Sequence, residues 1–240
     1  MKGMTITRSA ATKTLTVLTA LLLSVALAGC DAAAQAGAPP SKATAAPGSG
    51  LTAGEASKAM TQLAALPVKG RAPKTGYTRE KFGPAWADVD RNGCDTRNDI
   101  LARDLTGETF KPGTRNCVVA TGKLSDKYTG TTITFVRGNK TSSAVQIDHV
   151  VALSDAWQKG AQRISPEQRK QLANDPLNLM AADGPANSSK GDKDAATWLP
   201  SNKAFRCEYV ARQTAVKSKY QLWVTQAERD AIASILATCK

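Results

Sequence analysis

The change in composition at Leu51 sets the strongest limit on what this chain can fold into. Of its 240 residues, those from 31 to 50 are almost entirely Ala, Gly, Pro, Ser, Gln, Lys and Thr, with no large apolar side chain. Such a stretch is typical of a flexible tether. Because no second linker or internal repeat follows, we expect a single domain over residues 51–240. A hydrophobic content of 42% excludes a wholly disordered protein.

The segment before the tether has the pattern of an export signal. Lys2, Arg8 and Lys13 give it a positive start, and an apolar run from Leu15 to Ala28 follows. A positive start, a short apolar run and small residues at the end are typical of secretory signals. We therefore interpret residues 1–29 as a signal peptide. A single membrane anchor is the alternative, although the run is short for a span of about 20 residues.

The end of this segment, Leu27-Ala28-Gly29-Cys30, resembles the lipobox of bacterial lipoproteins. In those proteins the cysteine becomes the lipidated first residue. The resemblance implies that residues 30–50 are a lipidated cysteine and its tether, which anchor the protein on the outer face of the cytoplasmic membrane. Ordinary secretion, with Cys30 left over or removed, is the alternative.

The charge of the chain favours an acidic partner. Lys and Arg number 32 against 20 Asp and Glu, for a formal net charge of +12. Only three of the basic residues lie in the signal, so the surplus remains in the mature chain. A surplus of this kind favours nucleic acid, anionic lipid or acidic wall polymers. No protein partner is inferred.

Cysteine usage predicts disulfides. Once Cys30 is set aside, four cysteines remain, an even number in a chain with an export signal. Four cysteines allow three pairings. We favour Cys94–Cys117 and Cys207–Cys239, since each is local to one end of the domain. A structural zinc site is the alternative, although the chain has no Cys-x-x-Cys pair.

Residue periodicity predicts an α+β fold with more helix than strand. Two β-rich runs, Thr131–Val136 and Ala144–Val150, flank a Gly138-Asn139 turn, which indicates a hairpin. Helical spacing and capping signals predict further elements that begin near Thr52, Leu153, Ser165, Ser201 and Thr225.

The chain has one histidine, His149, which ends an apolar run. A lone histidine in such a place is most often a structural residue. Here Asp148 precedes it, Asn178 follows in a loop, and Asn187 stands one helical turn before Lys190. Neighbouring side chains of a strand point to opposite faces, so Asp148 and His149 converge only if the strand bends or ends there.

This order of residues resembles the HNH nucleases, also called ββα-metal or His-Me finger nucleases. The stretch 147–200 is similar to the nuclease domain shared by secreted bacterial HNH proteins and the GmrSD-type restriction enzymes, and weaker likeness extends from Trp86 to Cys239. The resemblance implies a ββα-metal core at about 144–200 with flanking helices. Two features depart from the family pattern. Asparagine occupies position 187 instead of a second histidine, and the gap between His149 and Asn178 requires a helical insertion.

The residue types suit phosphodiester hydrolysis, which needs a base for water and charge neutralisation at the phosphate. His149 suits the base because histidine titrates near neutral pH. Asp148 and Asn187 offer the oxygen ligands that Mg²⁺ or Mn²⁺ accepts. The resemblance implies the same roles and makes Asn178 the residue that orients the histidine. Lys190 is expected to contact the phosphate; a plain solvated lysine is the alternative.

The sequence therefore predicts an extracellular or surface-anchored metal-dependent endonuclease acting on DNA, with RNA left open. We expect little sequence specificity, since no base-reading module is recognised. One alternative is a non-catalytic lipoprotein that binds nucleic acid or wall polymer through a degenerate nuclease fold. A zinc-binding or calcium-binding protein without nuclease activity is another.

An acidic segment upstream approximates the spacing of an EF-hand calcium loop, through Asp88, Asp90, Asn92 and Asp99. Cys94 and Asp95 do not suit the interior of such a loop. We therefore favour an Asx-rich turn that caps a helix and keep calcium binding as the alternative. Arg97, in the same segment, is a candidate to reach a substrate phosphate.

Overall fold

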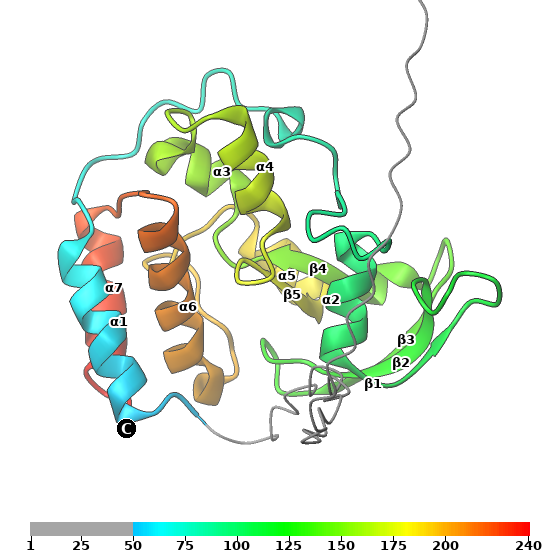
Figure 1. Ribbon diagram of the computed structural model, residues 1–240. Helices are drawn as coiled ribbons and strands as arrows, with labels where there is room; N and C mark the ends of the chain where they lie inside the picture. The colour runs from blue at the N-terminus through cyan, green and yellow to red at the C-terminus, as the bar shows by residue number, and fades with distance from the viewer. Residues whose placement is uncertain (1–49) are drawn as a thin grey trace, which may run out of the picture. The chain divides into compact units, whose positions relative to one another are not determined.

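Helix α1 (Ala53–Ala65) is the first regular element of the computed structural model, which describes residues 50–240 (Figure 1). The Thr52 side chain accepts a hydrogen bond from the Glu55 backbone, and the Glu55 carboxylate accepts one from the Thr52 backbone. This reciprocal capping is the reason that the helix begins where the sequence predicts. The predicted signal peptide, Cys30 and residues 31–49 of the tether lie outside the described residues.

The other elements confirm a mixed α+β fold. The helices are α2 (Thr96–Asp104), α3 (Leu153–Ala156), α4 (Pro166–Asn174), α5 (Gly184–Lys190), α6 (Arg206–Lys219) and α7 (Gln226–Leu236). The strands are β1 (Leu105–Phe110), β2 (Val119–Ser125), β3 (Thr132–Val136), β4 (Val145–His149) and β5 (Leu179–Asp183). Short 3₁₀ turns occupy Arg79–Phe82, Ser142–Ala144 and Lys203–Phe205, and a π-helical turn occupies Trp157–Ala161.

Within residues 50–240 the strands form two antiparallel sheets, one of β1, β2 and β3 and one of β4 and β5. The predicted hairpin is therefore wrong, because β3 and β4 belong to different sheets. The chain turns at Gly138, whose carbonyl accepts from the Ser142 backbone, and the 3₁₀ turn Ser142–Ala144 then separates β4 from β3. Strand β4 pairs instead with β5, with His149 opposite Leu179.

Helix α5 follows β5 without a loop, so β4, β5 and α5 form a strand–strand–helix unit. Asp183 caps the helix by accepting from the Ala186 backbone. The next residue must be glycine, because a Cβ at Gly184 would lie 2.1 Å from the Ser143 carbonyl oxygen. The predicted helical insertion is present between the two strands and consists of α3, the π-helical turn and α4.

Three clusters of buried side chains hold these elements together. One lies among α1, α6 and α7, which stand side by side in Figure 1. A second surrounds the insertion and includes Trp157 and Leu172. The third packs α2 between the two sheets, around Leu101 and Ile147. Strand β4 and its neighbours are thus fixed from several directions.

Two of the predicted helix caps are present and a third is wrong. Helices α4 and α7 begin at Ser165 and Thr225 caps as predicted. Ser201 is not a cap, because Asn202 takes that place and the Ser201 hydroxyl donates to the Tyr128 carbonyl. Every helix within residues 50–240 is too short or too polar to span a membrane.

Both favoured disulfides are confirmed. Cys94–Cys117 ties the loop before α2 to the turn between β1 and β2, and Cys207–Cys239 ties the start of α6 to the residues after α7. The four cysteines are therefore engaged with one another, which excludes the zinc alternative for them.

Loss of the second disulfide should destabilise the protein. A Cys207→Ser/Cys239→Ser variant is expected to lose about 3 kcal/mol of unfolding free energy, because opening a loop of 32 residues returns entropy to the unfolded chain. Urea denaturation with the first disulfide intact measures this loss. An unchanged midpoint would show that the bond contributes nothing to stability.

Candidate functional site

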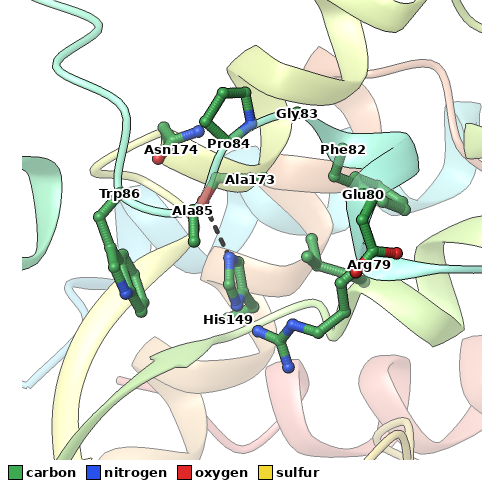
Figure 2. Close-up of a pocket in the computed structure, with 11 residues that line it drawn as sticks. Arg79, Glu80, Phe82, Gly83, Pro84, Ala85, Trp86, His149, Ala173 and Asn174 are labelled. Carbon is green, nitrogen blue, oxygen red and sulfur yellow. Dashed lines mark hydrogen bonds between the residues drawn. The ribbon is translucent and has the colours of Figure 1, made fainter.

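His149 ends β4 and is held in one orientation by the insertion. Its Nε2 lies 2.8 Å from the carbonyl oxygen of Ala173, and its side chain is buried (Figure 2). A carbonyl can only accept, so Nε2 carries the proton of this hydrogen bond. The other ring nitrogen, Nδ1, has no hydrogen-bond partner among residues 50–240 and keeps its lone pair.

The surroundings keep this imidazole neutral. Burial lowers the pKa of His149 from 6.5 to about 4, and the opposing effects of the Ala173 carbonyl and of Asp148 are smaller. The ring is thus an unprotonated base at neutral pH, which is the form that can take a proton from water.

The lowered pKa predicts acid destabilisation. Between about pH 6.5 and pH 4 the unfolded chain binds a proton that the folded state does not, so unfolding free energy should fall by about 3 kcal/mol across that range. Urea titrations of wild type and His149→Gln at several pH values measure the effect. We expect the variant to show a clearly smaller pH dependence, and equal dependence in both proteins would contradict the assignment.

Asp148 points to a different set of partners. Its carboxylate accepts from the Tyr128 hydroxyl and from Lys190 Nζ at 3.0 Å. Burial, with the charge of Asp148, raises the pKa of Tyr128 well above 10, so its hydroxyl stays protonated and donates. Lys190 also donates to the His149 carbonyl at 2.8 Å and is fully buried. That burial does not fit the predicted phosphate contact; Lys190 instead balances the charge of Asp148.

Asn178 holds two backbone segments that lie near the histidine. Its Oδ1 accepts from the Val151 backbone at 2.8 Å, and its Nδ2 donates to the carbonyls of Val151 and Leu172. Val151 follows His149 by two residues, and Leu172 precedes Ala173, the partner of the imidazole. The fully buried Asn178 thus links the backbone that follows His149 to the backbone that precedes Ala173.

Asn187 lies in the middle of α5 and not at its start. Its Nδ2 donates to Gln146 Oε1 at 2.8 Å, which leaves its Oδ1 without a partner among the described residues. Together with Asp148 and His149 it lines a cavity of about 410 Å³. These three residues, which span 39 positions of the chain, therefore line one cavity. The side chains of Asp148 and His149 nevertheless form hydrogen bonds with different partners.

The same cavity suits a magnesium-type ion. Asp148 and Asn187, which line it, carry carboxylate and carboxamide oxygens, both hard donors. In residues 50–240 there is no group of three His, Cys, Asp or Glu side chains arranged to hold a metal. Mg²⁺ prefers oxygen ligands and keeps several of its waters, so it needs few ligands from the protein.

Two arginines also line this cavity, Arg79 and Arg97. Arg97 is half-buried, and burial together with the nearby Arg137 lowers its pKa. Arg79 is exposed and has no salt-bridge partner among the described residues. These two guanidinium groups are the cationic side chains that line the cavity, and Asp148 and Asp192 are its acidic ones.

Three contributors were not assigned a role from the sequence. Arg79 and Tyr128 lie far from the motif in the chain and carry no local signal. Trp86 belongs to the segment that resembles the family, but no role was inferred for it. Its ring stacks on His149 with centroids 6.0 Å apart and an angle of 15° between the planes.

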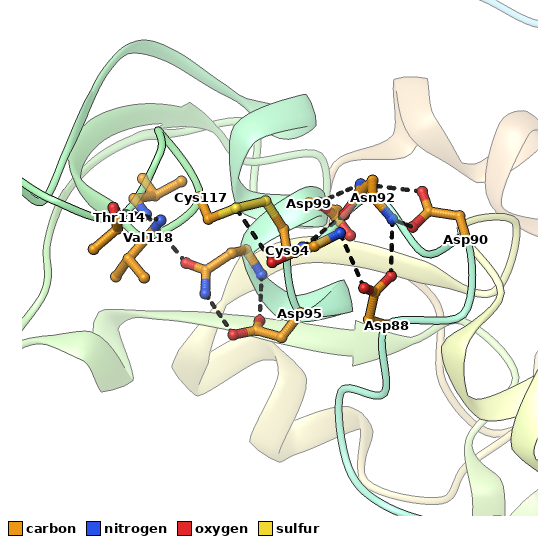
Figure 3. The surroundings of a disulfide bond; sticks show 12 residues. Asp88, Asp90, Asn92, Cys94, Asp95, Asp99, Thr114, Cys117 and Val118 are labelled. Carbon is orange, nitrogen blue, oxygen red and sulfur yellow. Dashed lines mark hydrogen bonds between the residues drawn. A yellow bond between two sulfur atoms is a disulfide. The ribbon is translucent and has the colours of Figure 1, made fainter.

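The acidic segment forms the predicted Asx-rich turn (Figure 3). The Asp88 carboxylate accepts from the backbones of Asn92 and Gly93, and the Asn92 side chain donates to Asp90 and Asp99. The following Asp95 caps α2 by accepting from the Asn98 backbone. The side chains of this turn satisfy one another.

Comparison with known proteins gives two findings. A model of the C-terminal domain of the GmrSD restriction endonucleases matches residues 95–235. An uncharacterized secreted protein of Arthroderma benhamiae is 38% identical over 186 residues, which cover 77% of this chain and 86% of that protein. No solved structure matches.

Proposed function

The chain belongs to the family of GmrSD restriction endonuclease C-terminal domains, and on that premise we propose that it is a metal-dependent endonuclease acting on DNA or RNA. The observation that carries the proposal is the neutral His149, with a free Nδ1, in one cavity with oxygens of Asp148 and Asn187. An unprotonated base beside hard oxygen donors and two arginines is the set of groups that phosphodiester hydrolysis needs.

In this proposal His149 is the general base. Nδ1 accepts the proton of the attacking water, while the hydrogen bond from Nε2 to the Ala173 carbonyl holds the ring in place. The same carbonyl stabilises the imidazolium that forms. Asn178 maintains this arrangement by fixing the backbone at Val151 and Leu172.

Asp148 and Asn187 would hold Mg²⁺ or Mn²⁺, which supplies positive charge to the phosphate and the leaving oxygen when bound. Tyr128 and Lys190 keep the Asp148 carboxylate in position through their hydrogen bonds. Arg79 and Arg97 bind phosphate oxygens at the cavity rim, the task that the sequence suggested for Lys190 and for Arg97.

We assign β4, β5 and α5 to the ββα-metal core of the HNH nucleases, with α3, the π-helical turn and α4 as an insertion. The antiparallel pairing of β4 with β5 and the direct start of α5 support this assignment. The separate sheet and the helices α1, α6 and α7 are additions around that core.

We further propose that the protein is exported and either anchored by a lipid on Cys30 or secreted. The sequence before residue 50 and the similar protein named as secreted support export. Both disulfides within the described residues agree with an oxidising compartment.

The experiment is cleavage of a mixed-sequence labelled oligonucleotide by the purified protein with Mg²⁺, with Mn²⁺ and with EDTA. We expect shorter products with either metal and none with EDTA. Intact oligonucleotide under every condition, with binding retained, would contradict the proposal and favour a binding protein of degenerate nuclease fold.

A further inference from the structure

A second cavity, of about 500 Å³, adjoins His149 and is not used by the proposed chemistry. Figure 2 shows Trp86 and Asn174 on one side of the imidazole and Arg79 and Glu80 on the other. Apolar side chains make most of its walls, among them Phe82, Pro84, Ala85 and Leu153. Arg79, Trp86, His149 and Leu153 line this cavity and the Asn187 cavity alike, so the two adjoin.

Asn174 lines this apolar cavity, and its side-chain oxygen is buried and unpaired. The residue is 1% exposed, and its Nδ2 donates to the Lys170 carbonyl at 2.9 Å. Since that carbonyl can only accept, the orientation of the amide is fixed and Oδ1 points elsewhere. Oδ1 has no hydrogen-bond partner among residues 50–240. A buried acceptor left unpaired is costly, and such atoms in native proteins commonly meet a ligand or a bound water.

We propose that this cavity receives an unpaired nucleobase of the strand that is cleaved, an inference that rests on the proposed function. A nucleobase is flat and apolar on its faces, which fits walls of aromatic and aliphatic side chains. Its edge carries N–H donors, which fit the Asn174 oxygen. The position beside His149 places this base next to the phosphodiester that the imidazole serves, and Arg79 lies between the two cavities.

This site predicts which form of nucleic acid the protein prefers as a substrate. A base inside a duplex has its N–H groups engaged and its faces stacked, so it must leave the helix to reach the buried Asn174. Single strands avoid that cost and are the preferred substrate. Because every base offers an N–H donor, one acceptor distinguishes them poorly, in agreement with low sequence specificity.

The test measures binding by fluorescence anisotropy in EDTA, where cleavage does not interfere. The probes are a labelled single-stranded hexanucleotide and its counterpart with abasic residues. We expect the wild-type protein to bind the base-containing probe about tenfold more tightly, the order of one stacked base. Equal affinity for the two probes would overturn the inference.

Two variants locate the effect. Asn174→Leu removes the acceptor, and Ala85→Trp fills the cavity from an exposed position that does not require repacking of the core. Both should bring the affinity ratio close to one. Ala204→Trp, an exposed alanine that lines neither cavity, is the control and should keep the ratio. Retention of the ratio in both cavity variants would place the base elsewhere and overturn the inference.

Hydrolysis of bis(4-nitrophenyl) phosphate, which has no nucleobase, separates this inference from the proposed function. Metal-dependent hydrolysis without base discrimination would uphold the nuclease chemistry and overturn the base site. Base discrimination without hydrolysis would uphold the base site and contradict the nuclease chemistry. A third outcome would also overturn the inference. If Asn174→Leu lost both hydrolysis and base discrimination while Ala85→Trp kept both, Asn174 would be a structural residue.

Discussion

Replacement of His149 with alanine is expected to lower kcat for metal-dependent hydrolysis of bis(4-nitrophenyl) phosphate by about 10²–10⁴-fold. The variant removes Nδ1, which has no other hydrogen-bond partner among the described residues, and no other histidine exists in the chain to replace it. Initial rates at saturating substrate, with thermal unfolding measured in parallel, give the comparison.

Free imidazole provides the control for this prediction. A base that has been deleted can be replaced in part by imidazole in solution, so the rate of the variant should rise with imidazole concentration. A purely structural histidine would show no such rise. A folded His149→Ala protein that keeps its wild-type kcat would contradict the role of the residue.

Replacement of Lys159 with methionine is expected to cost about 3–5 kcal/mol of unfolding free energy. The fully buried Lys159 Nζ lies 2.8 Å from Asp155, 2.6 Å from Asp194 and 2.6 Å from Glu228. The variant leaves these three buried carboxylates with two remaining cations, Lys217 and Arg71. An uncompensated buried charge is what makes such a change severe.

The charge state of this network supports the estimate. Burial by itself would raise the pKa of Asp194, but Lys159 and Arg71 outweigh it and lower that pKa to about 2. Urea denaturation measures the loss, with Lys111→Met as the control. Lys111 is exposed and forms no salt bridge among the described residues, so its change should stay within about 0.5 kcal/mol. Equal losses in the two variants would contradict the account.

Local signals in the sequence predicted several elements correctly. The starts of α1, α4 and α7 follow from Thr52, Ser165 and Thr225, because a cap and the helix that it begins are neighbours in the chain. The disulfides followed from the even number of cysteines and their closeness in pairs. The order of Asp148, His149, Asn178 and Asn187, through its resemblance to a nuclease family, predicted one site, and Asp148, His149 and Asn187 do line one cavity.

Features that depend on distant pairing were not predictable in this way. The partner of β4 is β5, which lies beyond a helical insertion, whereas the sequence suggested the adjacent β3. Lys190 stands one turn from Asn187 and could face solvent by its spacing. Its burial depends on Asp148, which the pairing of β4 with β5 brings close. Asn174 and Arg79 join the site only through the packing of the insertion.

The central claim is that His149 drives hydrolysis of DNA, and plasmid nicking by wild type and His149→Ala, purified side by side, tests it most directly. The reactions contain Mg²⁺ or Mn²⁺, with EDTA as the control. The account predicts nicked and linear DNA with wild type and metal, and intact supercoiled DNA with the variant or with EDTA. Equal cleavage by both proteins, or no cleavage by wild type with either metal, would contradict it.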